Sequence, residues 1–294
     1  MDTQAEIVLL DSAMGTRLEE MGLTFTEPLW TAKAVESHID KVMAIHKENI
    51  DAGAQIITTA STRTTPFAYH KAGYSGVESH TLARNFTTKT IRAAQKSIKD
   101  SGKDVKIAGC ITTLGECLKP EEYPGGIFGR PWHDAQLDVL DDKNVDVILA
   151  ESINGFREAK LITDLALKRT KPIWLCFLLK DEATIWNGDD LVTSAVKLEK
   201  IGVSAVGVNC TTTQASLKAI KLLKAAVSIP IIVLPNLGKS TVKSKKMGAI
   251  MPPDQFAEWT KKAVKAGATI IGACGGSNAE HIKHAHDALF KAPV

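Results

Sequence analysis

Side chains that can do chemistry stand at the ends of short apolar runs in this sequence. Cys210 and Cys274 each end such a run, and Asp11 and Glu151 end two others. Thiolates bind metals or attack electrophiles, whereas carboxylates bind cations or transfer protons. The five cysteines are an odd number in a long chain, so they suggest metal ligands, nucleophiles or core residues rather than a disulfide framework.

The apolar runs are the elements that would position these side chains. Eight of them are rich in β-branched residues and continuously apolar, which is typical of parallel strands covered on both faces. We predict strands at residues 7–11, 55–59, 105–110, 145–151, 172–178, 204–210, 229–235 and 269–274.

Segments with helical spacing separate the predicted strands, such as Ile39, Val42, Met43 and Ile50. A glycine that would end a helix precedes several strands, at residues 53, 202 and 267. Eight parallel strands with crossover helices can close on themselves and so remove the sheet's edges. We therefore predict an α/β fold, a (β/α)₈ barrel forming one domain over residues 1–294.

Barrel enzymes carry their active sites on the loops at the carboxyl ends of the strands. The polar residues at these ends are the candidates for function, and their shared position favours function over isolated loop roles. They are Asp11, Thr59, Ser61, Arg63, Cys110, Thr112, Glu151, Asn209, Cys210, Asn236 and Cys274.

Composition narrows the classes of partner. The net charge of +3 comes from 36 basic and 33 acidic residues without a basic stripe, which argues against nucleic-acid binding. No stretch has membrane-spanning length, and the first residues lack a secretory signal, so we expect a cytoplasmic protein. Lys239, Lys243, Lys245 and Lys246 suggest a solvated loop or a lid over an anionic substrate. A homo-oligomer is left open.

Several motifs along nearly the whole chain resemble the homocysteine S-methyltransferase family. They are LLDSAMGTRLEEMG at the start, EPLW at 27–30, AGAQIITTASTRTTP at 52–66, GVNC at 207–210, PNLG at 235–238 and IIGACGGSNAEHI at 270–282. The resemblance implies a metal-dependent methyltransferase that forms methionine from homocysteine. Its partners would be a small thiol and a methyl donor.

The resemblance also implies a zinc site, with one cysteine after the sixth strand and two adjacent cysteines after the eighth. Cys210 and Cys274 match two of these, but Gly275 stands in place of the third. A catalytic zinc ion usually has three protein ligands, so we expect a replacement. Cys110 is the nearest thiol candidate, and core packing is its alternative. Asp11 or Glu151 would supply oxygen instead, which would favour iron or another divalent metal.

Roles for the substrate-binding residues follow from the same resemblance. Glu151 would bind the amino group of homocysteine, and Asp11 would orient the substrate or a neighbouring loop. The backbone around Gly15 and Thr16 would hold the carboxylate. Thr59, Asn209 and Asn236 complete the predicted binding residues.

The methyl donor would be a small onium compound such as dimethylsulfoniopropionate, betaine or S-methylmethionine. Trp30 matches a donor-side tryptophan of the family, and an aromatic face attracts a cationic methyl group. Arg63 would clamp the donor's carboxylate. Residues 120–132, PEEYPGGIFGRPW, suggest a closing lid, with an ordinary solvent loop as the alternative.

Two other functions remain open from the sequence. A Schiff-base lyase or aldolase would need a lysine at a strand end, and Lys180 is the candidate. Gly275 also permits a non-catalytic relative that binds amino acids but has lost the full metal site.

Overall fold

The chain forms a closed barrel of parallel strands in a computed structural model that describes residues 6–238 and 249–291. The eight predicted strands are all present in this part of the chain. They are β1 (Val8–Leu9), β2 (Ile56–Thr58), β3 (Lys106–Thr112), β4 (Val147–Ile153), β5 (Ile173–Phe177), β6 (Ala205–Thr212), β7 (Ile231–Asn236) and β8 (Ile270–Ile271). The predicted (β/α)₈ fold is confirmed.

The strands pair in the order β1-β8-β7-β6-β5-β4-β3-β2, so β1 and β2 are the two ends of the sheet. A parallel bridge between Leu10 and Ile56 joins these ends. Gln55 strengthens the closure through two hydrogen bonds to Leu9. Its side-chain oxygen accepts from the Leu9 backbone amide at 2.8 Å, and its backbone amide donates to the Leu9 carbonyl at 2.8 Å. Closure leaves no strand edge free for pairing.

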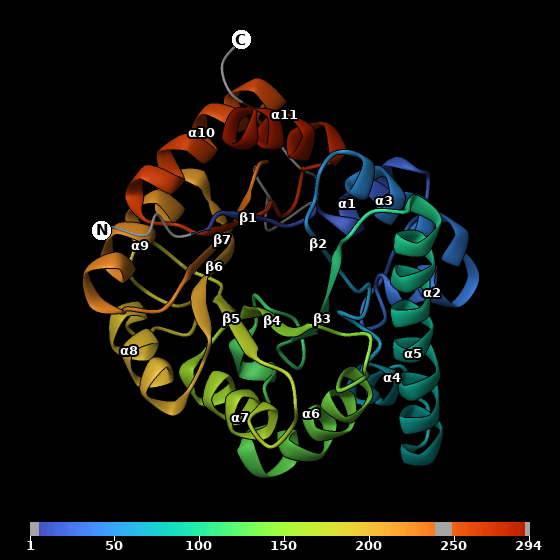
Figure 1. Ribbon diagram of the computed structural model, residues 1–294. Coiled ribbons are helices and arrows are strands. Elements are labelled where there is room, and N and C mark those ends of the chain that lie inside the picture. Colours follow the sequence, from blue (N-terminus) through green and yellow to red (C-terminus); the bar gives the residue numbers. More distant parts are fainter. Residues whose placement is uncertain (1–5, 239–248, 292–294) are drawn as a thin grey trace.

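Helices surround the strands as a ring, which Figure 1 shows along the barrel axis. They are α1 (Met14–Glu20), α2 (Ala32–Ser37), α3 (Ile39–Asp51), α4 (Pro66–Lys71), α5 (Gly76–Ser101), α6 (Gly126–Leu140), α7 (Phe156–Ala166), α8 (Leu191–Ile201), α9 (Thr213–Ala226), α10 (Pro253–Ala266) and α11 (Ala279–Phe290), with a 3₁₀ turn η1 at Pro120–Glu122. As predicted, Gly202 and Gly267 end α8 and α10 in the left-handed conformation.

Side chains of alternate strand residues fill the barrel. Ala108, Leu149, Ile232 and Leu234 belong to one buried cluster inside the strands. Because side chains alternate along a strand, the polar residues two positions further on from Ala108, Leu149 and Leu234 also face the interior, at the barrel's carboxyl end. These residues are Cys110, Glu151 and Asn236. The core thus sets the direction of the functional side chains.

Two strands are irregular where they reach this end. The pairing register shifts between Ala150 and Ile153 of β4 and between Asn209 and Thr212 of β6. Within these stretches Ser152 and Cys210 have φ values of +54° and +51°, which non-glycine residues seldom adopt. Such bulges redirect side chains beside active sites.

The segment at residues 120–132 differs from the predicted lid or solvent loop. Its first residues form η1, and Gly126 begins helix α6, which continues to Leu140. Ile127 and Phe128 are exposed in the first turn of that helix. The glycines and aromatic residues were therefore misleading, because seven of the thirteen residues belong to a regular helix.

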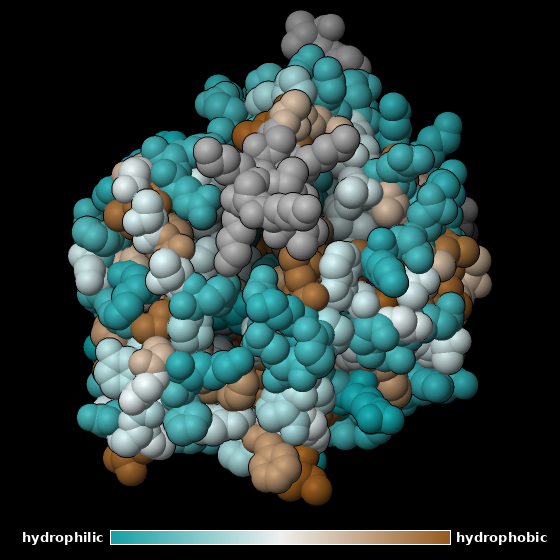
Figure 2. All heavy atoms as spheres, turned by 180° about the vertical axis from the view of Figure 1, so that it is seen from behind, coloured by the Kyte–Doolittle hydropathy of each residue, from teal (hydrophilic) through white to brown (hydrophobic). Residues whose placement is uncertain are grey.

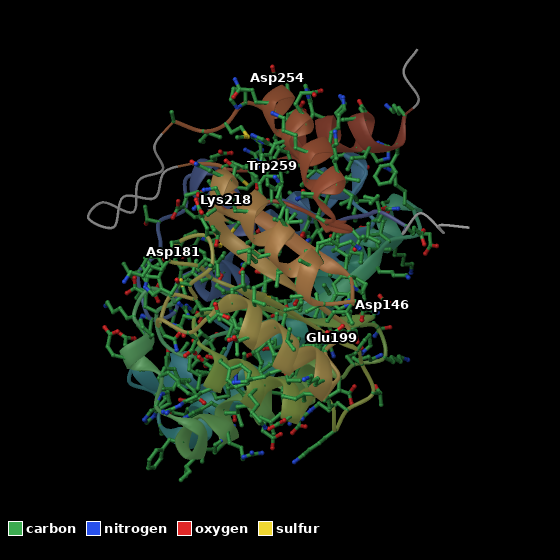
Figure 3. The ribbon with its side chains drawn as sticks, turned by 90° about the vertical axis from the view of Figure 1, so that its left-hand side faces the viewer. Asp146, Asp181, Glu199, Lys218, Asp254 and Trp259 are labelled. Atoms are coloured by element: carbon green, nitrogen blue, oxygen red, sulfur yellow. A yellow bond between two sulfur atoms is a disulfide. The ribbon has the colours of Figure 1, made fainter. Side chains whose placement is uncertain are left out.

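The two ends of the barrel can be followed in side view. Asp181, which follows β5, and Asp146, which precedes β4, are labelled on opposite sides of the molecule in Figure 3. Trp259 of α10 donates from its indole nitrogen to the Thr213 carbonyl at 3.1 Å, which ties α10 to the start of α9.

The surface matches the balanced composition. Figure 2 shows mostly hydrophilic residues on one face, with apolar residues scattered between them. Of the helices that the structure describes, none is long and apolar enough to cross a membrane.

Candidate active site

A cavity of about 320 Å³ opens at the carboxyl ends of the strands. It brings together residues from every part of the chain, because the barrel closes β1 against β8 and β2. Twelve residues were predicted from the sequence to have a catalytic, metal-binding or substrate-binding role. Eleven of these line the cavity, namely Asp11, Gly15, Thr16, Trp30, Thr59, Arg63, Glu151, Asn209, Cys210, Asn236 and Cys274.

Asp11 lies at the end of β1, where it bridges to β2. Its Oδ2 accepts from the Thr58 amide at 2.8 Å and its Oδ1 from the Thr58 hydroxyl at 2.9 Å. These hydrogen bonds favour the charged carboxylate, but burial outweighs them and raises the pKa of Asp11 to about 7. The carboxyl therefore titrates near neutral pH in the absence of a bound cation.

Glu151 has still less support from its surroundings. Burial and the nearby Asp11 carboxylate together raise its pKa to about 7. In the described part of the chain, its hydrogen-bond partner is the thiol of Cys110, 3.9 Å from Oε2. Two carboxyl groups with so few donors favour a positively charged ligand between them.

Cys210 and Cys274 meet in the wall of the same cavity. They are 64 residues apart in sequence, yet their Cα atoms are 5.4 Å apart and their sulfurs form a disulfide. The positive φ of Cys210 turns its side chain out of the strand's alternation. The fold therefore brings together the two thiols that the sequence singled out.

Hydrogen bonds hold each cysteine in place. Asn209 accepts from the Ser152 amide at 2.7 Å, and the Ser152 hydroxyl lies 3.6 Å from the Cys210 sulfur. The Cys274 amide donates to the Pro235 carbonyl at 2.8 Å, and its carbonyl accepts from Ser277 at 2.7 Å. Asn209 thus positions the bulge of β4 as well as lining the cavity.

Trp30 forms part of the cavity wall beside Gly15. Its backbone φ is +37°, and a Cβ atom at Gly15 would come within 2.7 Å of the indole ring. Position 15 therefore requires glycine, because any side chain there would displace the Trp30 ring. Thr16 ties the same region to the last strand, since its hydroxyl accepts from the Gly276 amide at 3.1 Å.

Arg63 lies between the main cavity and a smaller one of about 220 Å³. Its Nη1 donates to the Gly115 carbonyl at 2.6 Å, and its Nε is 3.6 Å from a Glu27 carboxylate oxygen. This Nε is buried without a hydrogen-bond partner. The guanidinium thus has donor capacity left for a ligand.

Cys110 is the predicted site residue that does not line the cavity. Its thiol lies behind Glu151 and 3.6 Å from the Thr62 hydroxyl, and burial raises its pKa well above the usual range. Among residues 6–238 and 249–291, no three His, Cys, Asp or Glu side chains are grouped to hold a metal ion. Cys110 pairs with Leu149, two residues before Glu151 on β4, so it lies deeper in the barrel than Glu151. Its role as a third metal ligand stays a prediction.

The structure places the remaining predicted residues plainly. Thr59 is engaged in the scaffold, since its hydroxyl accepts from the Cys110 amide at 2.9 Å. Cys176 is buried in the core, and His281 is buried and bonded to Asn278. Lys180 is exposed and does not line the cavity, which removes the basis for a Schiff-base site. The cluster of Lys239, Lys243, Lys245 and Lys246 lies outside the described residues.

Some cavity residues were missed by the sequence reasoning. Glu116, Cys117 and Leu118 line the wall after β3, and Ser152 lines it beside Glu151. No spacing pattern marks the first three, because a loop decides their position. Ser152 could have been found as the neighbour of Glu151, and Glu27 as the first residue of the EPLW motif.

The cysteine pair is suited to a soft metal ion. Two thiolates are ligands that zinc prefers, and the cavity leaves room for a substrate sulfur beside them. Gly275 supplies no third side-chain ligand at the position where the family motif has its second cysteine. In their reduced form Cys210 and Cys274 would therefore offer a metal two thiolates, and its further ligands would have to come from elsewhere.

Fold and site together define a barrel enzyme whose cavity is lined by a pair of cysteines and a pair of carboxyl groups. The homocysteine S-methyltransferase family model matches residues 8–289. The chain therefore belongs to the homocysteine S-methyltransferase family, and it is a methyltransferase.

Individual relatives cover the whole barrel. The chain is 28% identical to homocysteine S-methyltransferase 2 of Zea mays, over 100% of this chain and 93% of that protein. It is 26% identical to the selenocysteine methyltransferase of Astragalus bisulcatus, over 90% of this chain and 87% of the relative. The metallated form of the homocysteine methyltransferase MmuM from Escherichia coli has the same fold, with a TM-score of 0.81, 24% identity and coverage of 96% of each chain.

Proposed function

We propose that this enzyme moves a methyl group from a small onium donor to homocysteine and so forms methionine. The observation that carries the proposal is the pairing, in one cavity, of Asp11 and Glu151 with Cys210 and Cys274. The carboxylates suit the amino end of an amino acid, and the thiols suit a metal that binds its sulfur. Family membership supports the same reaction.

The acceptor's ammonium group would lie against Asp11 and Glu151. Both carboxyl groups have a pKa of about 7 in the free enzyme, and a bound ammonium would lower both values by stabilising the charged forms. The bound ammonium would supply hydrogen-bond donors that the two carboxyl groups lack in the free enzyme. The enzyme would therefore select an amino acid over a thiol without an amino group. The amides around Gly15 and Thr16 would hold the carboxylate of the acceptor.

Cys210 and Cys274, in their reduced form, would hold a divalent metal, with zinc as the first choice. Such an ion lowers the pKa of a bound thiol, so that homocysteine is present as the thiolate at neutral pH. Asn209 and Ser152 would keep Cys210 oriented through their hydrogen bonds.

The reaction is a displacement at the methyl carbon. A bond forms between the homocysteine sulfur and the methyl carbon, and the bond from that carbon to the donor's positive sulfur or nitrogen breaks. The bonding pair remains on the donor atom, which becomes neutral, and the thiol proton leaves to solvent. This chain holds the two reactants in line and excludes water.

The donor would occupy the side of the cavity near Trp30 and Arg63. The face of Trp30 suits a cationic methyl group. Arg63, which lines both cavities, would bind the carboxylate of a compact donor such as dimethylsulfoniopropionate, betaine or S-methylmethionine. The smaller cavity beside Arg63 offers space for the rest of such a donor.

One assay tests the whole proposal. Protein purified anaerobically with reductant is loaded with zinc or iron, and methionine formation from homocysteine is measured with each of the three donors. We expect one donor to support turnover. Absence of methionine with every donor in metal-loaded protein would refute the proposal, and turnover with selenocysteine alone would change the acceptor.

A further inference from the structure

The wall of the cavity after β3 is a short loop at residues 113–118 that has no regular structure of its own. Three of its residues, Glu116, Cys117 and Leu118, face the cavity. The loop is nevertheless held by side chains from distant elements. Asn154 donates to the Cys117 carbonyl at 3.1 Å, and Trp186 donates to the Leu118 carbonyl at 2.8 Å.

The start of the loop is held by a carboxyl group in the protein interior. Glu158, in the first turn of α7, is 1% exposed and accepts the Leu114 amide at 2.8 Å. It also accepts the Thr113 hydroxyl. Burying a carboxyl group costs free energy unless hydrogen bonds compensate for the lost water, so each of these bonds matters for stability.

A buried histidine completes this arrangement. His133 of α6 has no exposed surface, and its Nε2 is 2.8 Å from the same Glu158 oxygen that accepts the Leu114 amide. Its Nδ1 is buried without a hydrogen-bond partner. We therefore assign the hydrogen to Nε2, so that the ring donates to Glu158 and fixes the orientation of its carboxyl.

The loop leads directly to the donor side of the cavity. Gly115 follows the anchored Leu114, and its carbonyl accepts from Nη1 of Arg63 at 2.6 Å. A shift of Leu114 would move this carbonyl and release the guanidinium. The hydrogen bonds thus form one chain from His133 through Glu158 and the loop to Arg63.

We propose that Glu158 and His133 are positioning residues that fix the 113–118 loop and, through Gly115, set Arg63 for the methyl donor. Neither residue lines the cavity. Their effect on turnover therefore arises from the loop's position and not from contact with substrate. This role rests on the proposed function as far as the donor is concerned, whereas the anchoring of the loop does not.

Amide hydrogen exchange tests the anchoring without any activity. Glu158→Leu should speed exchange of the Leu114 amide by about tenfold or more, the scale expected when one hydrogen bond to a charged group is lost. Glu158→Gln retains an acceptor oxygen and should leave the exchange close to that of the unaltered protein. Unchanged exchange at Leu114 in Glu158→Leu would overturn the proposal.

Kinetics test the consequence for the donor. Glu158→Leu and His133→Leu should raise the KM for the donor at least about fivefold while the KM for homocysteine changes less than about twofold, since only the donor side depends on Arg63. His133→Gln, which can still donate to Glu158, should restore most of the loss. Equal changes in both KM values would refute the link to Arg63.

A control variant separates position from stability. Leu165→Ala, in the same helix α7 but in the hydrophobic core, should destabilise the protein without changing either KM. If Leu165→Ala shifts the donor KM as Glu158→Leu does, general loosening explains the effect and the proposal fails. If no donor gives turnover in the unaltered protein but Leu114 exchange responds, the proposed function fails and the anchoring stands.

Discussion

Two carboxyl sites in this protein differ in how many hydrogen bonds they accept. One is Glu158 on α7, which is buried, and the other is the pair at the cavity, where Asp11 is buried and Glu151 is half-buried. Glu158 receives hydrogen bonds from Leu114, Thr113 and His133. Asp11 and Glu151 lie at the cavity, and the partner of Glu151 is a weak thiol donor. The oxygens of Glu158 are occupied by hydrogen bonds from the protein itself. Those of Glu151 remain available to accept hydrogen bonds from a ligand.

The number of hydrogen bonds accepted distinguishes a carboxyl group with a structural role from one that binds a ligand better than its exposed fraction does. Asp11 and Glu158 are almost equally inaccessible, with 8% and 1% exposure. Burial raises the pKa of Asp11 and Glu151 to about 7, because their hydrogen bonds do not offset the loss of water. Two carboxyl groups with raised pKa values at one cavity, one of them bonded only weakly, favour a cationic ligand.

The largest expected effect comes from neutralising Glu151. Glu151→Gln should lower kcat/KM for homocysteine about 100-fold, because losing one partner of a charged hydrogen bond costs roughly 2–3 kcal/mol. With 4-mercaptobutanoate, which lacks the amino group, the same variant should lose little.

Glu158→Gln is the matched control, since it makes the same chemical change at the other carboxyl site. We expect its kcat/KM to stay within about threefold of the unaltered enzyme. A similar loss in both variants, or an equal loss with both thiols, would contradict the distinction between the two carboxyl sites.

Stability should respond to the two carboxyl sites with opposite sign. Glu158→Leu should lower the free energy of unfolding by about 2–3 kcal/mol, because it strands buried donors. Glu151→Gln should raise it by about 1 kcal/mol at pH 8, since the folded state then no longer holds a poorly solvated charge. Urea denaturation of the reduced proteins measures both.

The pH dependence of that gain follows from the raised pKa. Folding raises the pKa of Glu151 from 4.5 to about 7, so ionisation destabilises the folded protein above about pH 7 and not below the unfolded value. The advantage of Glu151→Gln should therefore shrink as the pH falls from 7 towards 4.5. A gain that is constant with pH would point to packing instead.

Ligand affinity should show the reverse dependence on pH. Homoserine carries the same ammonium group as homocysteine but no thiol, so its binding isolates the carboxyl pair. Well below pH 7 its dissociation constant should increase by more than tenfold and up to about a hundredfold for each pH unit, as Asp11 and Glu151 each take up a proton. Calorimetry measures the binding, and the dependence should become shallower in Glu151→Gln. A flat profile between pH 5 and 8 would contradict the assignment of the pair.

The sequence was sufficient for the barrel and for most of the cavity. Strand positions followed from continuous apolar runs, and the rule that barrel sites lie at the carboxyl ends placed Glu151, Cys210 and Cys274 at one end. Alternation along β4 explains the position of Glu151, which shares its direction with Leu149 before it. Cys210 instead reaches the cavity through the bulge of β6.

What the sequence could not provide depends on loops and bulges. Cys110 was expected with the other thiols because its strand opens onto the same end, but it lies behind Glu151. The bulges at Ser152 and Cys210 have no marker such as glycine, since both are non-glycine residues with positive φ. The anchor of the 113–118 loop joins α6, α7 and β3, and contacts so distant in sequence leave no local pattern.

Cys110 gives the smallest expected effect and the finest test of the carboxyl pair. Its thiol donates to Glu151 and so lowers the pKa of that carboxyl slightly. Cys110→Ala should therefore raise the midpoint of the pH dependence of homoserine binding by about half a pH unit. At pH 7 this is about a two- to threefold weaker affinity. Cys176→Ala, which removes another buried thiol with no hydrogen bond to Glu151 in the described structure, should leave the profile unchanged.

The same Cys110 variant decides whether this residue also serves the metal. Metal content of reduced, zinc-loaded protein should fall sharply in Cys210→Ser and Cys274→Ser, because each loses one of two thiolate ligands. It should stay unchanged in Cys110→Ala, whose thiol faces Glu151 and not the cysteine pair. Loss of metal in Cys110→Ala would instead make Cys110 the missing third ligand.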